Sequence, residues 1–251
     1  MHSYNVFSLF YDSFTNDVNY SQRSEYVLSL FKKFDKVPSL MLDLACGTGN
    51  FSVQFAKQGI DVIGVDISED MLNVALKKNI YLEKPVMYIC QPAEELELYG
   101  TVDGAVCMLD SLNHITDFEN FKKAISNVSL YLEPERLFIF DINTPYKHRT
   151  ILGNNSFKLK HKNIRCNWYN SFREEDNTVT VHLDFVERTG ILKKQVYTEE
   201  FCERAYTDEE IKKALSECNF EILAIYGENT YKEPKPDSQR NIYVTRRVNN
   251  G

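Results

Sequence analysis

The 251-residue chain lacks any apolar stretch that approaches the roughly 20 residues needed for a membrane-spanning helix. Its N-terminus also lacks a basic segment followed by an apolar run, so a signal peptide is not recognised. We therefore expect a cytoplasmic protein. The hydrophobic fraction of 43% is sufficient for a packed core and argues against disorder.

Paired cysteines of the CxxC type are also missing. The six cysteines stand at positions 46, 90, 107, 166, 202 and 218, and no two have zinc-binding spacing. No set of His, Asp and Glu has metal-ligand spacing either, so we expect no metal. Cys46, Cys90 and Cys107 lie in or beside apolar segments, and we expect them to be buried small hydrophobes in a reducing compartment.

Positive charge is scarce, with 29 Lys and Arg against 36 Asp and Glu and a net charge of -7. An acidic surface does not attract a polyphosphate strand, so a small-molecule substrate is favoured over nucleic acid. One segment mixes Lys158, Lys160 and Arg165 with Trp168 and Tyr169, as nucleic-acid sites do. We interpret it as an exposed strand face with core aromatics behind it.

Between residues 40 and 141, short apolar segments alternate with helical patterns. The expected strands are Leu40–Leu44, Asp61–Val65, Val86–Cys90, Val102–Met108 and Leu137–Asp141. The expected helices are 21–34, 51–58, 68–79 and 118–132. Ser21 and Ser68 are the expected N-caps of the first and the third of these helices. The strands are apolar throughout, as strands covered on both faces should be. A helix from Thr207 to Glu217 and strands Phe220–Tyr226 and Asn241–Arg246 complete a Rossmann-like α/β fold with a mostly parallel seven-stranded sheet.

The periodicity changes after Pro145. Residues 156–206 alternate as antiparallel strands do, most clearly over Thr178–Val186, and Asp176-Asn177 predicts a turn. We therefore expect a small antiparallel β insert over 146–204 that shapes the substrate pocket. It would divide an α/β domain made of residues 1–145 and 205–251, and it could supply the surface of a homodimer.

The segment after the first strand is typical of a nucleotide-binding turn. The strand contains Asp43 near its end, and Gly47 and Gly49 follow before the next helix. Glycines allow a tight turn and a close approach to a ligand, at a site beyond the carboxyl ends of the strands. The next strand is followed by Asp66, a carboxylate able to accept hydrogen bonds from both hydroxyls of a ribose.

NAD and S-adenosylmethionine (SAM) are the two cofactors that such a turn could bind. The dinucleotide fingerprint GxGxxG needs a third glycine where this chain has Ser52. Asp43 would also repel a pyrophosphate, whereas it would attract a cationic amine. SAM has no phosphate and carries an α-amine and a sulfonium, so the charge favours SAM, with S-adenosylhomocysteine (SAH) as product.

These segments resemble the class I SAM-dependent methyltransferases. Leu42–Asn50 looks like their first motif, and Val62–Ser68 looks like their second. The resemblance implies that the loop residues bind the methionine end, that Asp66 binds the ribose and that two apolar side chains pack on the adenine. The implied SAM-binding residues of these two motifs are Asp43, Ala45, Gly47, Gly49, Asp66, Ile67 and Met71.

The third motif departs from the family pattern. Pro92 stands where an acid usually contacts the adenine amine, so Gln91, Glu94 or the N–H of Ala93 would have to replace it. The fourth motif is similar over residues 102–114 and implies that Leu109 and Asp110 lie beside the sulfur and the amine. The resemblance covers about residues 5–145 and 205–247. The N-terminal segment looks like the lid of small-molecule members, and an antiparallel insert is carried by some amine and sugar-amine N-methyltransferases.

Methyl transfer from a sulfonium is an in-line displacement in which the enzyme mainly positions the reactants. Tyr11 and Tyr20 could stabilise the sulfonium with their rings, although Tyr11 could equally be a core aromatic. His114, which follows the fourth strand, is a candidate base for an amine acceptor or, alternatively, a locally satisfied histidine. We therefore predict a SAM-dependent methyltransferase acting on an amine or hydroxyl of a small molecule. An RNA methyltransferase and a non-catalytic SAM-binding protein are the alternatives.

Overall fold

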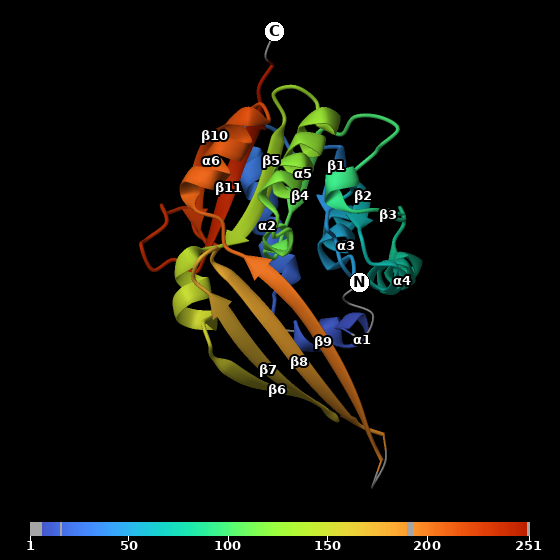
Figure 1. Ribbon diagram of the computed structural model, residues 1–251. Coiled ribbons are helices and arrows are strands. Elements are labelled where there is room, and N and C mark those ends of the chain that lie inside the picture. Colours follow the sequence, from blue (N-terminus) through green and yellow to red (C-terminus); the bar gives the residue numbers. More distant parts are fainter. Residues whose placement is uncertain (1–6, 16, 190–192, 250–251) are drawn as a thin grey trace.

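The computed structural model describes residues 7–15, 17–189 and 193–249, which form a seven-stranded sheet flanked by helices and a separate four-stranded sheet (Figure 1). The first six residues and Asn16 of the expected lid lie outside the described residues. Among the described residues, no helix combines the length and the apolar content needed to cross a membrane.

The larger sheet has the strand order β10-β11-β5-β4-β1-β2-β3. Its strands are β1 Leu40–Leu44, β2 Asp61–Asp66, β3 Met87–Cys90, β4 Gly104–Cys107, β5 Leu137–Asn143, β10 Phe220–Gly227 and β11 Arg240–Arg247. Strands β1 to β5 are parallel, whereas β11 runs antiparallel to both β5 and β10. The predicted mostly parallel seven-stranded sheet is therefore confirmed.

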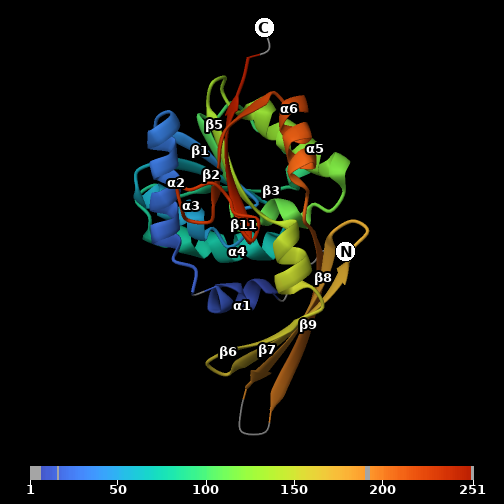
Figure 2. The ribbon, with the colours of Figure 1, turned by 90° about the vertical axis from the view of Figure 1, so that its left-hand side faces the viewer.

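Helices cover both faces of this sheet, with α2 and α3 on one side and α5 and α6 on the other (Figure 2). Their bounds are α2 Tyr20–Phe34, α3 Asn50–Lys57, α5 Phe118–Tyr131 and α6 Asp208–Glu217, and α4 spans Glu69–Lys78. Phe31 and Phe55 belong to the core on one face, and Phe121 and Leu215 to the core on the other. Burial on both faces explains why the central strands are continuously apolar.

Strand β3 is an exception, because it lies at the edge of the sheet. Its first residue, Met87, is 60% exposed, and its last residue, Cys90, is also exposed. The expectation that all these strands are covered on both faces was wrong here, as was the burial expected for Cys90. Cys107, on the central strand β4, is buried as expected, while Cys46 in the glycine loop is half-buried.

The N-caps observed in the structure agree only in part with those predicted from the sequence. The Ser68 hydroxyl accepts from the Met71 N–H at 3.3 Å, as expected for the cap of α4. Ser21, however, is not the cap of α2. The Asn19 side chain accepts from the Gln22 N–H at 3.1 Å, and the helix begins at Tyr20.

Four short helical segments were not predicted. They are η1 Asn79–Tyr81, η2 Ala93–Glu95, η3 Ser111–His114 and η4 Lys147–Leu152, the last of which is a π-helix. Segment η3 follows β4, and η4 begins four residues after β5. These two segments place side chains at the carboxyl edge of the large sheet.

The smaller sheet confirms the predicted antiparallel strands. It contains β6 Ser156–His161, β7 Ile164–Arg173, β8 Thr178–Arg188 and β9 Lys194–Arg204, paired in sequence order. One face is apolar, and Val181, Leu183 and Phe185 on it are buried. Helix α1, Phe7–Phe14, packs against this face, where the rings of Phe10 and Phe185 lie 5.1 Å apart. We call this apolar side the inner face.

The outer face of the small sheet is polar. Lys158, Lys160 and Arg165 are exposed there, while Trp168 packs with the core of the inner face. This arrangement agrees with a solvated strand face that has an aromatic side chain behind it. Tyr169 differs from the expectation, because strand alternation places it on the outer face, where it is 46% exposed.

Candidate functional site

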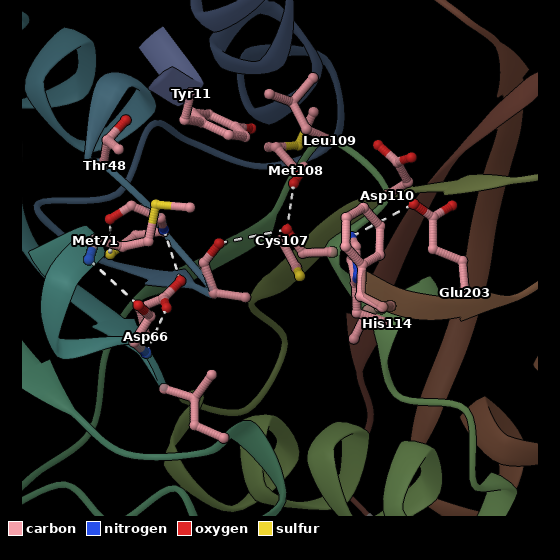
Figure 3. A pocket seen from close by; sticks show the side chains of 18 of the residues that line it. Tyr11, Thr48, Asp66, Met71, Cys107, Met108, Leu109, Asp110, His114 and Glu203 are labelled. Carbon is pink, nitrogen blue, oxygen red and sulfur yellow. Dashed lines mark hydrogen bonds and ion pairs between the residues drawn. The ribbon is translucent and has the colours of Figure 1, made fainter. Parts of the chain in front are cut away.

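A cavity of about 1130 Å³ lies at the carboxyl ends of β1, β2 and β4 (Figure 3). The chain order of the strands reverses between β1 and β4, which is where open α/β sheets form a ligand crevice. Helix α1 and the inner face of the small sheet complete the walls. Ligand pockets usually measure about 300–1,000 Å³, so this cavity has room for a cofactor and a second molecule.

Thirteen of the fourteen residues predicted for the site line this cavity. They are Tyr11, Tyr20, Asp43, Ala45, Gly47, Asp66, Ile67, Met71, Gln91, Ala93, Leu109, Asp110 and His114. Gly49 does not belong to the lining. It has a φ of +73°, and a Cβ added to it would lie 2.3 Å from the Tyr88 hydroxyl. Packing against Tyr88 is by itself a reason for glycine at this position, and the cofactor role implied for Gly49 stays a prediction.

Gly47, unlike Gly49, has no neighbouring side chain where a Cβ would lie. Its φ of +55° also disfavours a side chain, but a Cβ added to it would meet no atom within 4 Å. The space in front of its backbone is thus open to the cavity. This open space would allow a ligand to approach the backbone of Gly47 closely.

Asp66 joins the glycine loop to the start of α4. Its Oδ2 accepts from the Gly47 N–H at 2.7 Å, and its Oδ1 accepts from the Ser68 N–H at 2.8 Å. Each oxygen therefore keeps a second acceptor position. Burial raises the pKa of Asp66, and these two N–H donors oppose the rise. The geometry suits a diol that donates one hydrogen bond to each oxygen.

Asp43 is not the simple anion that the sequence argument assumed. It is 2% exposed, and its Oδ2 accepts a 2.5 Å hydrogen bond from the Ser52 hydroxyl. Burial raises the pKa of Asp43 to about 7, although the Ser52 hydrogen bond lowers it and Asp66 raises it further. A cation bound nearby would favour the charged form. Ser52, in place of a third glycine, thus holds this carboxylate.

The region expected to bind adenine has an open apolar surface. Ile67 is 49% exposed and Met71 is buried, and both line the cavity. The Gln91 side chain is occupied elsewhere, because its Oε1 accepts from the Glu97 N–H at 3.3 Å and its Nε2 donates to the Glu97 carbonyl at 3.2 Å. Gln91 is therefore a poor replacement for the acid that Pro92 displaces.

The backbone after β4 is held in an unusual conformation. Leu109 and Asp110 have successive φ values of +57° and +55°, which cost side-chain-bearing residues on the order of 1 kcal/mol each. Asp141, at the end region of β5, accepts from the Leu109 N–H at 3.0 Å and from the Asp110 N–H at 2.5 Å. This buried carboxylate holds the backbone from which the Asp110 side chain projects.

A buried network then surrounds the Asp110 carboxylate. Its Oδ1 accepts from Arg240 at 2.7 Å, and its Oδ2 accepts from the Asn143 amide. Burial would raise the pKa of Asp110, but Arg240, Lys147 and His114 outweigh it and hold the pKa below its usual value. Arg240 also pairs with Asp141 at 3.4 Å. Asp110 is therefore an anion with both oxygens engaged.

Sequence reasoning missed Asp141, Asn143 and Arg240. Asp141 had a recognisable signal, because it follows an apolar run as Asp43 and Asp66 do. Arg240 had no recognisable signal, because its partners Asp141 and Asp110 lie 99 and 130 positions away along the chain.

His114 faces the cavity from η3 beside an acidic partner. Its Nε2 lies 3.8 Å from Oε1 of Glu203, its side chain is 30% exposed, and its ring packs against Phe201 at 5.2 Å. Figure 3 shows this pair on the opposite side of the cavity from Asp66, with Met108 and Leu109 between. Sequence reasoning missed Glu203, although strand alternation with Phe201 directs it inward.

The second oxygen of Glu203 faces a buried histidine. His148, on η4, is fully buried, and its Nε2 lies 3.6 Å from Oε2 of Glu203. Its Nδ1 lies 3.1 Å from the carbonyl of Asn177, a distance that places a proton on this nitrogen. Glu203 thus lies between a half-buried and a fully buried imidazole.

Helix α1 closes the cavity over the glycine loop. Asp12 accepts from the Thr48 hydroxyl at 2.6 Å and from the Asn50 amide at 2.9 Å, and it pairs with Lys78 at 2.8 Å. These contacts place Tyr11 in the cavity wall beside Tyr20. Burial raises the pKa of both phenols, so both keep their protons. The lid function expected of the N-terminal segment stays a prediction.

The small sheet supplies the remaining wall, and most of its contribution is apolar. Its lining residues are Leu159, Cys166, Trp168, Val181, Leu183, Phe185, Phe201, Cys202 and Glu203. Glu203 is the one charged side chain in this set of described residues.

Comparison with known proteins identifies the family. Residues 41–135 match a family model described as a methyltransferase domain. The crystal structure of a SAM-dependent methyltransferase from Clostridium acetobutylicum is similar over 98% of this chain and 99% of its own, with 31% identity and a TM-score of 0.88. The chain belongs to the SAM-dependent methyltransferases. The predicted class and cofactor are therefore confirmed.

A curated relative and a second solved structure are also similar to this chain. The putative methyltransferase YqeM of Bacillus subtilis is 27% identical over 239 residues, which cover 94% of each chain. The SAM-bound amino pentose methyltransferase CalS10 from Micromonospora echinaspora has the same fold, with a TM-score of 0.76 and 15% identity over 99% of each chain. The cavity of the present chain fits SAM, because Asp66 has acceptor positions for the ribose hydroxyls and the space in front of Gly47 is open.

Proposed function

We propose that this methyltransferase transfers the methyl group of SAM to an amine or hydroxyl group of a small molecule, with His114 as the base. The observation that carries the proposal is the position of the His114–Glu203 pair. It faces the same cavity as Asp66 and lies on the opposite side of it. A cofactor bound at Asp66 and an acceptor bound at His114 would therefore share one space.

The bound cofactor supplies an electrophilic methyl group on a sulfonium. An ammonium acceptor has no lone pair, so it must lose a proton before it can attack. His114 would take this proton, and Glu203 at 3.8 Å would stabilise the imidazolium that forms. Asp66 would hold the ribose, Asp43 would favour the cationic methionine end, and the rings of Tyr11 and Tyr20 would face the sulfonium.

The walls of the cavity support a small acceptor over RNA. Helix α1 and the inner face of the small sheet enclose the acceptor side. The basic residues Lys158, Lys160 and Arg165 lie on the outer face, so they do not provide a path for a phosphate backbone toward His114. The structural neighbour CalS10 is an amino pentose methyltransferase, which is consistent with an amine acceptor.

The test is SAH formation by the purified protein with SAM and separate pools of amines, phenols, alcohols and total RNA. We expect SAH to form with at least one pool of small molecules and not with RNA. Turnover that depends on RNA alone would contradict the proposal. SAM binding without turnover in any pool would favour the non-catalytic alternative.

Replacing His114 by Gln tests the base. We expect kcat to fall by about 10²-fold, the usual contribution of a positioned general base, with SAM affinity unchanged by calorimetry. His182→Gln is the matched control, because His182 lies on the polar outer face of β8 and pairs with Asp184 and Glu200. Equal turnover in the two variants would remove His114 from the base role.

A further inference from the structure

The acceptor side of the cavity has one polar end and one long apolar wall. The polar end consists of His114, Glu203, Asp110 and Lys147. The apolar wall consists of side chains from two separate elements, α1 and the small sheet. Its half-buried apolar members are Phe14, Leu159, Trp168 and Phe201, and the phenol of Tyr11 on α1 lines the same cavity beside Tyr20.

Fully buried apolar side chains pack together with these members of the wall. Phe185 and Val181 are fully buried, and the ring of Phe14 lies 5.6 Å from that of Phe185. The wall is therefore part of a packed cluster that α1 and the sheet form together. The wall is apolar because residues of α1 and of the small sheet contribute to one core cluster. Residues of several elements would have to be substituted together to make the whole wall polar.

The wall also offers little hydrogen bonding. The indole Nε1 of Trp168, the one strong donor among the four side chains Phe14, Leu159, Trp168 and Phe201, already donates to the Asn170 side chain at 2.5 Å. A ligand with hydroxyl groups around its body would lose hydrogen bonds to water and find no replacement at this wall. An apolar body would gain by burial against it.

From this asymmetry we infer that the acceptor is an amphipathic molecule, with an apolar ring or chain against the Trp168 wall and a single nucleophilic group directed at His114. The inference rests on the proposed function and names its substrate class. It excludes polyhydroxylated acceptors such as sugars, even though one structural neighbour is an amino pentose methyltransferase.

The chain carries its own reporter for this wall. Trp168 is the single tryptophan, so the intrinsic emission at long wavelength reports directly on the acceptor side. We would titrate the SAH complex with cyclohexylamine, 4-phenylcyclohexylamine and glucosamine. The first and the last share a six-membered ring that carries a primary amine, and they differ chiefly in their hydroxyl groups.

We expect saturable changes in Trp168 emission with the two apolar amines. Affinity should rise by about tenfold or more from the smaller to the larger compound, because each buried methylene-sized unit adds severalfold. Glucosamine should give no saturable change at the same concentrations. Glucosamine binding as tight as that of cyclohexylamine, or no binding by either apolar amine, would overturn the inference.

A pair of variants locates the binding. Leu159→Asn places an amide on the wall, and Val196→Asn makes the same type of change on the outer face of the same sheet, where Val196 is 65% exposed. We expect the first to weaken 4-phenylcyclohexylamine about tenfold and the second to leave it unchanged, with both still binding SAH as proof of folding. Equal affinities in the two variants would contradict the inference. If Leu159→Asn fails to bind SAH, the wild-type comparison of the three amines still decides.

The turnover assay distinguishes a failure of the inference about the acceptor from a failure of the proposed function. SAH formation with glucosamine and not with the apolar amines would leave the proposed function standing and overturn the inference. SAH formation with RNA alone would remove the proposed function as well.

Discussion

The two sheets of this methyltransferase contribute opposite chemistry to one cavity. The parallel sheet is apolar inside and places carboxylates at its carboxyl edge, where Asp43, Asp66 and Asp141 bind hydroxyl or backbone N–H groups. The small antiparallel sheet has a polar outer face and an inner face on which mostly apolar side chains meet the cavity. Under the proposed function, the cofactor would therefore bind among fixed polar groups, and the body of the acceptor would lie against an apolar surface.

This difference follows from how each sheet is covered. A sheet buried on both faces can present polar side chains only where its strands end, so its functional groups collect at one edge. An antiparallel sheet with one solvated face can offer a whole face to a ligand. Changes at the edge of the parallel sheet should thus affect cofactor binding and folding, whereas changes on the inner face should affect the acceptor.

The largest effect is expected for Arg240→Met. This change leaves Asp110 and Asp141 buried without their cation, which should lower the free energy of unfolding by about 3 kcal/mol. Arg246→Met on the same strand is the control, because Arg246 pairs with Glu221 near the surface and should cost at most about 1 kcal/mol. Urea denaturation of both variants measures the difference. Similar small losses would show that the network does not hold the edge of the sheet.

The next effect is expected for Asp66→Ala, which removes both acceptor oxygens from the proposed ribose site. We expect SAM affinity to fall more than tenfold, equivalent to about 1.4 kcal/mol or more. Asp61→Ala is the matched control, because Asp61 begins the same strand, β2, and pairs with the exposed Lys84. Titration calorimetry with SAM gives both values. Unchanged SAM affinity in Asp66→Ala would remove this residue from the ribose role.

The smallest effect is a pH dependence that originates at Asp43. Burial raises the pKa of this acid to about 7, and bound SAM, which is cationic, would favour the carboxylate. SAM affinity should therefore rise by about fivefold between pH 6 and pH 7.5, as the free protein loses this proton. The sign is opposite for the unliganded fold, because an acid with a raised pKa costs stability as the pH rises from about 4 to 7.

Asp43→Asn separates this effect from other titrations. The variant keeps the size of the side chain and cannot ionise, so its SAM affinity should change less with pH than that of the wild type. Calorimetry at several pH values compares the two proteins. The same pH dependence in both would place the titrating group elsewhere.

The sequence by itself determined the alternation of strands and helices, the glycine loop, Asp66 after the second strand and the antiparallel insert. These features depend on local spacing, because the periods of helices and strands and the turn chemistry act over a few residues. Thirteen predicted site residues consequently reached the cavity.

Only the tertiary structure decided the partners of these residues. Arg240 pairs with Asp110, which lies 130 positions away along the chain. Glu203 on β9 of the small sheet pairs with His114, which follows β4 of the large sheet. Gly49 also packs against Tyr88 of β3, two strands away from β1 in the sheet. Pairings of this kind depend on which elements lie side by side, and local spacing carries no information about them. The apolar wall that we infer for the acceptor has the same origin, since it exists only where α1 and the small sheet come together.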